Sequence, residues 1–99
     1  MKTAIDISPC DKEILISLLE SYLPQTPVWA HGSRVTGGAK PWSELDLVVF
    51  NGKKQKYELS LLREAFEESN LSFRVELLER ESLPENFKSN ITASHVEII

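Results

Sequence analysis

Hydrophobic residues recur every three or four positions in two stretches of the chain, which is the spacing of an amphipathic helix. At the start of the first stretch, Ser8 suits the helix N-cap, Pro9 suits the first helical position, and Asp11 completes a capping-box-like pair. Pro24 ends this pattern. Its apolar positions are Ile14, Leu15, Leu18, Leu19 and Tyr22. The second stretch covers residues 57–69, so the pattern predicts two helices that each bury one side.

Three shorter runs, at residues 28–31, 45–50 and 73–78, have the apolar or alternating pattern of β-strands. A closing helix is expected within residues 83–91, and residues 96–99 suit either a short edge strand or a frayed end. Asn51 and Gly52 can mark a hairpin turn, but no strand pattern follows them, which favours a polar loop leading into the second helix.

Length and composition set limits on the class of protein. A chain of 99 residues is expected to form a single domain, residues 1–99, and its 41% hydrophobic and 26% charged residues are typical of a soluble globular protein. The net charge of -4 argues against extended nucleic acid as a partner. The single Cys10 fits a reducing compartment, no apolar run reaches the length of a membrane span, and Asp6 interrupts any signal-peptide core. We therefore expect a cytoplasmic protein.

The candidate chemistry begins at a Gly32-Ser33 turn directly after the first predicted strand. Ten residues separate this turn from an acid-x-acid, Glu44-Leu45-Asp46, at the entrance of the second strand. Because successive side chains of a strand point to opposite faces, Glu44 and Asp46 share a face. Clustered carboxylates favour a divalent cation such as Mg²⁺, and the backbone N–H groups of the turn favour a phosphate.

A third acid, Glu76, lies in the middle of the third strand between Val75 and Leu77. An acid in this position is costly unless it meets a cation. If the third strand lies beside the second, Glu76 meets Glu44 and Asp46. The pattern therefore predicts a site of three carboxylates facing the Gly-Ser turn. A salt bridge from Glu76 to Arg74 or to a lysine is the alternative.

These motifs resemble the signature of the minimal nucleotidyltransferases of the DNA polymerase β superfamily. The matching stretches are Gly32-Ser33-Arg34, Gly37, Pro41-Trp42-Ser43-Glu44-Leu45-Asp46-Leu47 and Phe73-Arg74-Val75-Glu76-Leu77, and the resemblance covers the chain from about residue 11. The departures are Glu44 and Glu76, where the family has Asp. The expected fold is α/β, with a small mixed sheet of three to four strands and helices packed mainly on one face.

The resemblance also implies an activity and a partner. Glu44, Asp46 and Glu76 are expected to be catalytic and to bind two Mg²⁺ ions, and Gly32, Ser33 and Arg34 are expected to bind ATP. The product would be an AMP unit on an acceptor hydroxyl, with release of pyrophosphate. Many members of the family pair with a HEPN-family toxin ribonuclease and act as its antitoxin, which makes a HEPN-type protein the expected partner and leaves homo-oligomerisation open.

Each residue also has a plainer interpretation. Arg34 and Lys40 suit a solvated surface as well as a phosphate contact, and His31 suits a packed or hydrogen-bonded histidine better than a catalytic one. Trp42 suits a loop anchor better than a base-stacking residue. The two Asp-to-Glu departures are each longer by one methylene, and Mg²⁺ demands near-ideal geometry. A degenerate module that binds nucleotide or partner, and neutralises a HEPN toxin by complex formation, is therefore the alternative function.

Overall fold

The computed structural model describes residues 5–50 and 55–98. Along the chain these residues form the following helices and strands: α1 (Pro9–Tyr22), β1 (Val28–His31), α2 (Ser33–Thr36), β2 (Leu45–Val49), α3 (Lys56–Glu67), β3 (Val75–Glu79), the 3₁₀ turn η2 (Arg80–Ser82), α4 (Glu85–Ala93) and β4 (Val96–Glu97). The predicted loop at Asn51–Gly52 lies outside the described residues. None of the helices in the described ranges combines the length and hydrophobicity needed to cross a bilayer.

The four strands form one mixed sheet in the order β3-β2-β1-β4. The central strand β2 pairs in parallel with β3 and antiparallel with β1, which in turn pairs antiparallel with β4. Of the two alternatives for the last residues, an edge strand or a frayed end, the structure has the edge strand, because Val96 is paired with Ala30 and the Ile98 N–H donates to the Val28 carbonyl at 2.9 Å. The α/β fold with a four-stranded mixed sheet is therefore confirmed.

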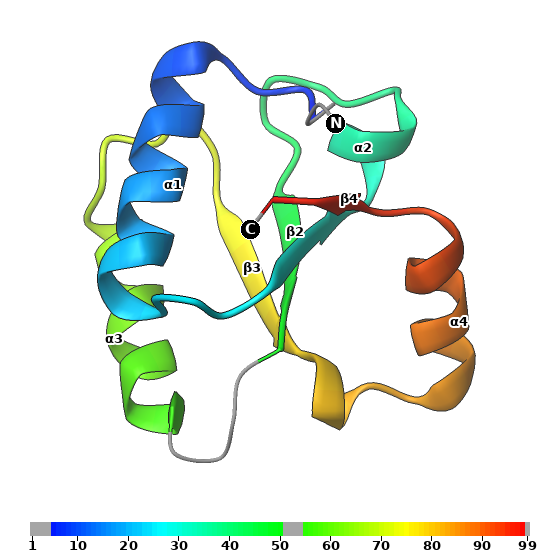
Figure 1. Cartoon of the computed structure of the whole chain (residues 1–99). Coiled ribbons are helices and arrows are strands. Elements are labelled where there is room, and N and C mark those ends of the chain that lie inside the picture. The colour runs from blue at the N-terminus through cyan, green and yellow to red at the C-terminus, as the bar shows by residue number, and fades with distance from the viewer. Residues whose placement is uncertain (1–4, 51–54, 99) are drawn as a thin grey trace.

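Helices cover both faces of the sheet unequally. The two longer helices, α1 and α3, pack on one face and against each other, and the short helix α4 lies on the other side (Figure 1). The main core lies under α1 and α3. Its fully buried side chains are Leu15, Leu19, Leu23, Val28, Ala30, Leu45, Leu47, Val49 and Leu62. On the opposite face, Val48 and Ile91 are also buried, which gives α4 a smaller apolar contact.

Side-chain hydrogen bonds of Ser8 and Asp11 fix the start of α1. Ser8 is the N-cap as predicted, since its Oγ accepts from the Asp11 N–H at 3.1 Å. The Asp11 carboxylate accepts from the Ser72 hydroxyl at 2.7 Å and from the Ser72 N–H at 3.4 Å. Asp11 is only 8% exposed and joins α1 to the segment before β3.

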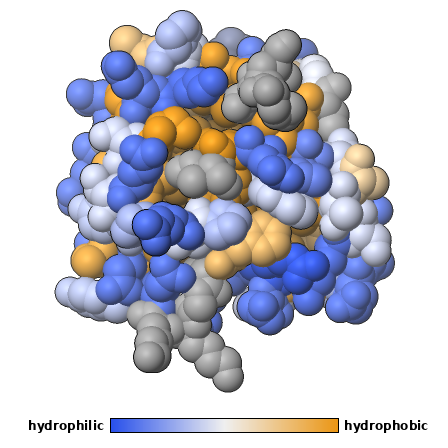
Figure 2. Space-filling model, viewed as in Figure 1, coloured by the Kyte–Doolittle hydropathy of each residue, from blue (hydrophilic) through white to orange (hydrophobic). Residues whose placement is uncertain are grey.

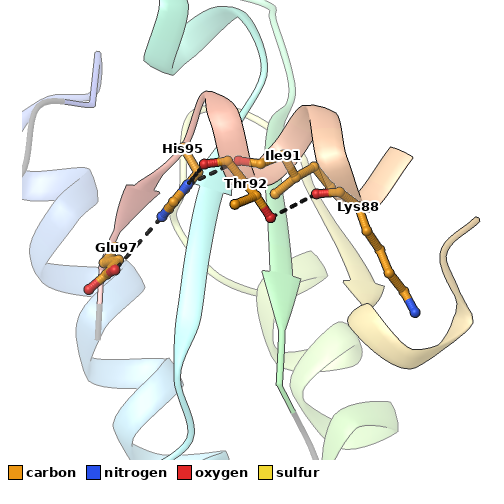
Figure 3. Close-up of polar contacts among 5 residues, drawn as sticks. All are labelled: Lys88, Ile91, Thr92, His95 and Glu97. Atoms are coloured by element: carbon orange, nitrogen blue, oxygen red, sulfur yellow. Dashed lines mark hydrogen bonds and ion pairs between the residues drawn. The ribbon is translucent and has the colours of Figure 1, made fainter. Parts of the chain in front are cut away.

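His95 fixes the junction between α4 and β4 (Figure 3). Its Nδ1 lies 3.0 Å from the Ile91 carbonyl and 3.1 Å from the Thr92 carbonyl, and because carbonyls only accept, Nδ1 carries the hydrogen. The His95 ring stacks on Trp29 with 3.7 Å between centroids, and its Nε2 lies 3.8 Å from Glu97. These contacts join the end of the helix to the two strands beneath it.

On the face shown in Figure 1, the molecular surface is largely polar around an apolar centre (Figure 2). Several hydrophobic residues remain only partly buried where they pack on the core. Those from the N-terminal segment, α1, α2 and the position after β4 are Ile5, Ile7, Leu18, Tyr22, Val35 and Ile98.

Candidate functional site

The sheet brings two of the predicted acids directly side by side. In the parallel pairing of β2 with β3, Asp46 is opposite Glu76, and in the antiparallel pairing of β2 with β1, Asp46 is opposite His31. Residues opposite each other in adjacent strands share a face of the sheet. Their neighbours Leu45 and Leu47 point to the other face and are fully buried. The alternation of the sequence therefore predicts correctly which side chains of β2 point into the core and which point away from it.

Gly32 connects the turn to this carboxylate pair. A Cβ atom at Gly32 would lie 2.5 Å from Oδ2 of Asp46, so the Asp46 carboxylate rests on the bare backbone of the turn. Gly32 has φ 91° and ψ -165°, a conformation that is essentially restricted to glycine. Ser33 follows as the first residue of α2, whose first turn leaves backbone N–H groups without helical partners. The two predicted parts of the site, turn and acid, are in contact.

The charges of the site perturb one another. Burial raises the pKa of Asp46, and the negative charges of Glu44 and Glu76 raise it further, while the positive form of His31 opposes both effects. Glu44 lies directly before β2 and is exposed, as is Glu76. Glu44 and Glu76 therefore both lie close enough to Asp46 for their charges to act on its carboxylate.

His31 occupies a position that sequence reasoning treated only as a packed histidine. Burial lowers its pKa, although the Asp46 charge opposes that shift, and its Nε2 is buried without a hydrogen bond within the described residues. The Phe87 ring of α4 meets the imidazole edge-on, with centroids 5.8 Å apart. The neutral imidazole is therefore favoured, and it lies beside Asp46 on the side opposite Glu76. Only the antiparallel pairing of β1 with β2 places His31 there, and no local sequence pattern gives that pairing.

The donor set fits Mg²⁺ by chemistry, because carboxylate oxygens are the ligands that this hard cation prefers. A cation would also offset the crowding that raises the Asp46 pKa. Within residues 5–50 and 55–98, however, no three side chains of His, Cys, Asp or Glu converge closely enough to hold a metal ion. Asp46 and Glu76 thus lie side by side, and Glu44 lies near Asp46, without the three acids forming a closed set of ligands.

The structure gives Arg34 a different position from the expected contact with nucleotide. The side chain is only 7% exposed, and its guanidinium lies 4.3 Å from the centre of the Phe73 ring. Its N–H groups donate to four carbonyl oxygens: Nε to Ser43 at 3.0 Å, Nη1 to Asp6 at 2.7 Å, and Nη2 to Lys40 at 3.3 Å and Pro41 at 3.2 Å. The sequence missed this burial because the four acceptors are backbone groups. Arg34 therefore ties α2 to the loop that leads into Glu44.

Comparison with known proteins places these features in a family. The family model described as "Polymerase beta, Nucleotidyltransferase" matches residues 13–99. The chain is 37% identical over 95 residues to the "Probable protein adenylyltransferase MntA" of Haemophilus influenzae, and the match covers 95% of this chain and 83% of that relative.

Two solved structures share the fold at lower identity. A toxin–antitoxin crystal structure with AMP-PNP matches with a TM-score of 0.64 and 18% identity, over 89% of this chain and 72% of that one. The toxin–antitoxin MntA-HepT matches with a TM-score of 0.57 and 15% identity, over 93% of this chain and 72% of that one. The fold, the Gly32-Ser33 turn beside Asp46 and the family match agree: the chain belongs to the polymerase β nucleotidyltransferase family, as a minimal nucleotidyltransferase similar to MntA.

Proposed function

We propose that this domain is a Mg²⁺-dependent adenylyltransferase that moves AMP from ATP to a hydroxyl group of a HEPN-type partner toxin, and thereby acts as an antitoxin. The observation that carries the proposal is the paired register of Asp46 and Glu76, with the Asp46 carboxylate resting on Gly32. This arrangement holds a phosphate-binding turn against two acids. The relative named as a protein adenylyltransferase and the toxin–antitoxin neighbours support the substrate and the partner.

The chemistry assigned to these residues is a displacement at the α-phosphorus of ATP. The backbone N–H groups of the Gly32-Ser33 turn bind the triphosphate. The acceptor oxygen forms a bond to the α-phosphorus, the bond from that phosphorus to the bridging oxygen breaks, and pyrophosphate leaves. Glu76, at the exposed edge of the pair, takes the proton of the acceptor hydroxyl.

Glu44, Asp46 and Glu76 are the residues that would hold Mg²⁺. Two bound ions would supply charge neutralisation for the attacking and leaving oxygens. Asp46 is the central ligand in this assignment, because its carboxylate is the one that both other acids influence. Glu44, which is exposed, reaches the site from the loop that precedes β2.

Intact-mass spectrometry of a HEPN-type protein incubated with this domain, ATP and Mg²⁺ tests the proposal. The partner should gain mass in AMP increments, and Glu44→Ala and Asp46→Ala should each prevent the gain. Glu64→Ala is the matched control, since it removes an exposed acid on α3, away from the paired strands. A partner that gains no mass from the wild-type domain contradicts transfer.

A second candidate is a module that neutralises the partner by binding alone. It is favoured by one observation, namely that no three metal-binding side chains converge within the described part of the chain. Calorimetry separates the two. A transferase should bind ATP more tightly with Mg²⁺ than with EDTA, because clustered acids repel a bare triphosphate, whereas equal affinity in both conditions supports the binding module.

A further inference from the structure

Residues 40–43 form a tight turn at the edge of the proposed site. The Ser43 N–H donates to the Lys40 carbonyl at 3.0 Å, and the Lys40 N–H donates to Oγ of Ser43 at 2.8 Å. Pro41 takes the second position, where its ring fixes φ, and Trp42 takes the third. The turn is thus closed by two hydrogen bonds and stiffened by proline, with Trp42 at its tip.

Arg34 holds the backbone of this turn from beneath. Three of its four donor contacts go to the carbonyl oxygens of Lys40, Pro41 and Ser43. The guanidinium is buried and charged, which makes these hydrogen bonds stronger than neutral ones. Because both the turn and its support are fixed, the position of the Trp42 backbone is determined by the fold before anything binds.

Trp42 is nevertheless 76% exposed. A tryptophan side chain can bury about 150–250 Å² of largely apolar surface. The turn keeps most of that surface in water. An aromatic ring presented on a rigid backbone loses little conformational freedom on binding, which favours recognition of a ligand over a packing role.

The position of Trp42 relative to the site indicates which ligand it contacts. The turn is supported by the residue that follows Ser33, and Trp42 precedes Glu44 by two positions. Among the described residues, the other exposed large hydrophobic residue is Tyr57, which is 71% exposed. Tyr57 is the second residue of α3 and follows Lys56, which pairs with Glu79 at the far end of β3. Trp42 is therefore the exposed large aromatic residue at the site end of the sheet.

We propose that Trp42 is a stacking platform for the base of the bound nucleoside triphosphate, an inference that rests on the proposed function. The turn and the acids provide for the triphosphate and leave the base without a partner. Every base offers a flat aromatic face, so stacking on one indole tolerates different bases. The domain should accordingly bind ATP and GTP with similar affinity.

Fluorescence tests this directly, because the chain has only two tryptophans. In a Trp29→Phe variant, Trp42 is the sole indole, and the phenyl ring keeps an aromatic contact for His95. With Mg²⁺, ATP and GTP should quench the Trp42 emission. Inorganic tripolyphosphate should compete with ATP and yet leave the emission unchanged. Quenching of the same size by tripolyphosphate overturns the proposal.

Binding measured by calorimetry gives the second arm. Trp42→Ala should weaken Mg²⁺-ATP between about fivefold and a hundredfold, the range for loss of one base–aromatic stack, and leave tripolyphosphate affinity unchanged. Trp42→Phe should restore most of the loss, and Tyr57→Ala is the matched exposed-aromatic control. If Trp42→Ala leaves ATP affinity intact and weakens only the complex with a HEPN-type partner, the residue is a protein contact and the base platform is overturned. If neither ATP nor tripolyphosphate binds, the proposed function itself fails.

Discussion

Replacing Gly32 with alanine is the smallest change that tests whether the turn and the Asp46 carboxylate act as one unit. The new methyl group has two consequences. It places an L side chain at φ 91° and ψ -165°, and it sets a Cβ atom 2.5 Å from Oδ2 of Asp46, well inside ordinary contact distance. The first effect is a backbone effect that any alanine would have, and the second depends on Asp46.

The two contributions can be given magnitudes. A residue forced into a region restricted to glycine costs about 1–3 kcal/mol. Pushing the Asp46 side chain off its rotamer adds about 0.5–1.5 kcal/mol. Each 1 kcal/mol lowers Tm by about 4–8 °C for a domain of this size. The two costs add to about 1.5–4.5 kcal/mol. Gly32→Ala should therefore lower Tm by roughly 6–36 °C, which is this sum multiplied by the shift per kcal/mol.

Gly37 supplies the matched control. It has φ 109° and ψ 164°, close to the conformation of Gly32, but a Cβ atom there would meet nothing within 4 Å. Gly37→Ala should show the backbone cost alone. Urea denaturation of both variants, each alone and combined with Asp46→Ala, gives a double-mutant cycle. Coupling of about 0.5–1.5 kcal/mol between residues 32 and 46, and none between 37 and 46, is expected from the rotamer cost.

An equal loss of stability from Gly32→Ala with and without the Asp46 side chain would refute the contact between the turn and the carboxylate. In that case the carboxylate does not rest on the turn, and the site is looser than described. A loss of transfer in Gly32→Ala accompanied by unchanged stability would also contradict the account, because the methyl group cannot move the carboxylate without cost.

Three further changes have definite signs. Asp46→Asn should abolish transfer and leave the metal-free fold as stable as wild type, or slightly more stable, at neutral pH. Burial raises the pKa of Asp46 in the folded state, so this group stabilises the fold below its ordinary pKa of 3.8 and loses that stabilising effect as the pH rises through the raised folded-state pKa. Arg34→Lys should lower the free energy of unfolding, measured by urea denaturation, by about 2–4 kcal/mol. An ammonium group cannot donate to all four carbonyls, and hydrogen bonds to charged groups contribute about 1.5–3 kcal/mol each. Wild-type stability in this variant would show that the hydrogen bonds of Arg34 are not needed for stability. Asp11→Ala should lower the free energy of unfolding by about 1–3 kcal/mol at pH 7. The Ser72 hydrogen bond lowers the pKa of Asp11, so the stability difference between this variant and wild type should narrow as the pH falls below 3.8 through the lowered folded-state pKa. A stability difference that does not change with pH would exclude the ionised carboxylate as the cause of the loss.

The sequence determined the local structure of the chain because periodicity and capping are local properties. The spacing of apolar residues placed α1 and α3, and the Ser8 cap began α1 where the structure has it. Strand β1 has the predicted bounds, whereas β3 begins two residues later than predicted, at Val75. The acid-x-acid at the start of β2 was sufficient to show that Asp46 points away from the core.

Only the tertiary structure decided which groups surround Asp46. Alternation along a strand gives the face of each side chain, but it does not give the neighbouring strand or its register. The parallel register set Glu76 opposite Asp46, and the antiparallel register set His31 on its other side. The contact with Gly32 depends on where two separate segments meet, which no local pattern encodes.

The role of Arg34 was also decided by the tertiary structure and not by the sequence. Next to a Gly-Ser turn, an arginine suits a phosphate contact, and nothing in its immediate sequence distinguishes that role from a structural one. Its burial arises because backbone carbonyls from two distant segments and the Phe73 ring close around it. A charged group can be buried when its hydrogen bonds are satisfied, and satisfaction by backbone atoms is a property of the folded chain that residue identities do not record.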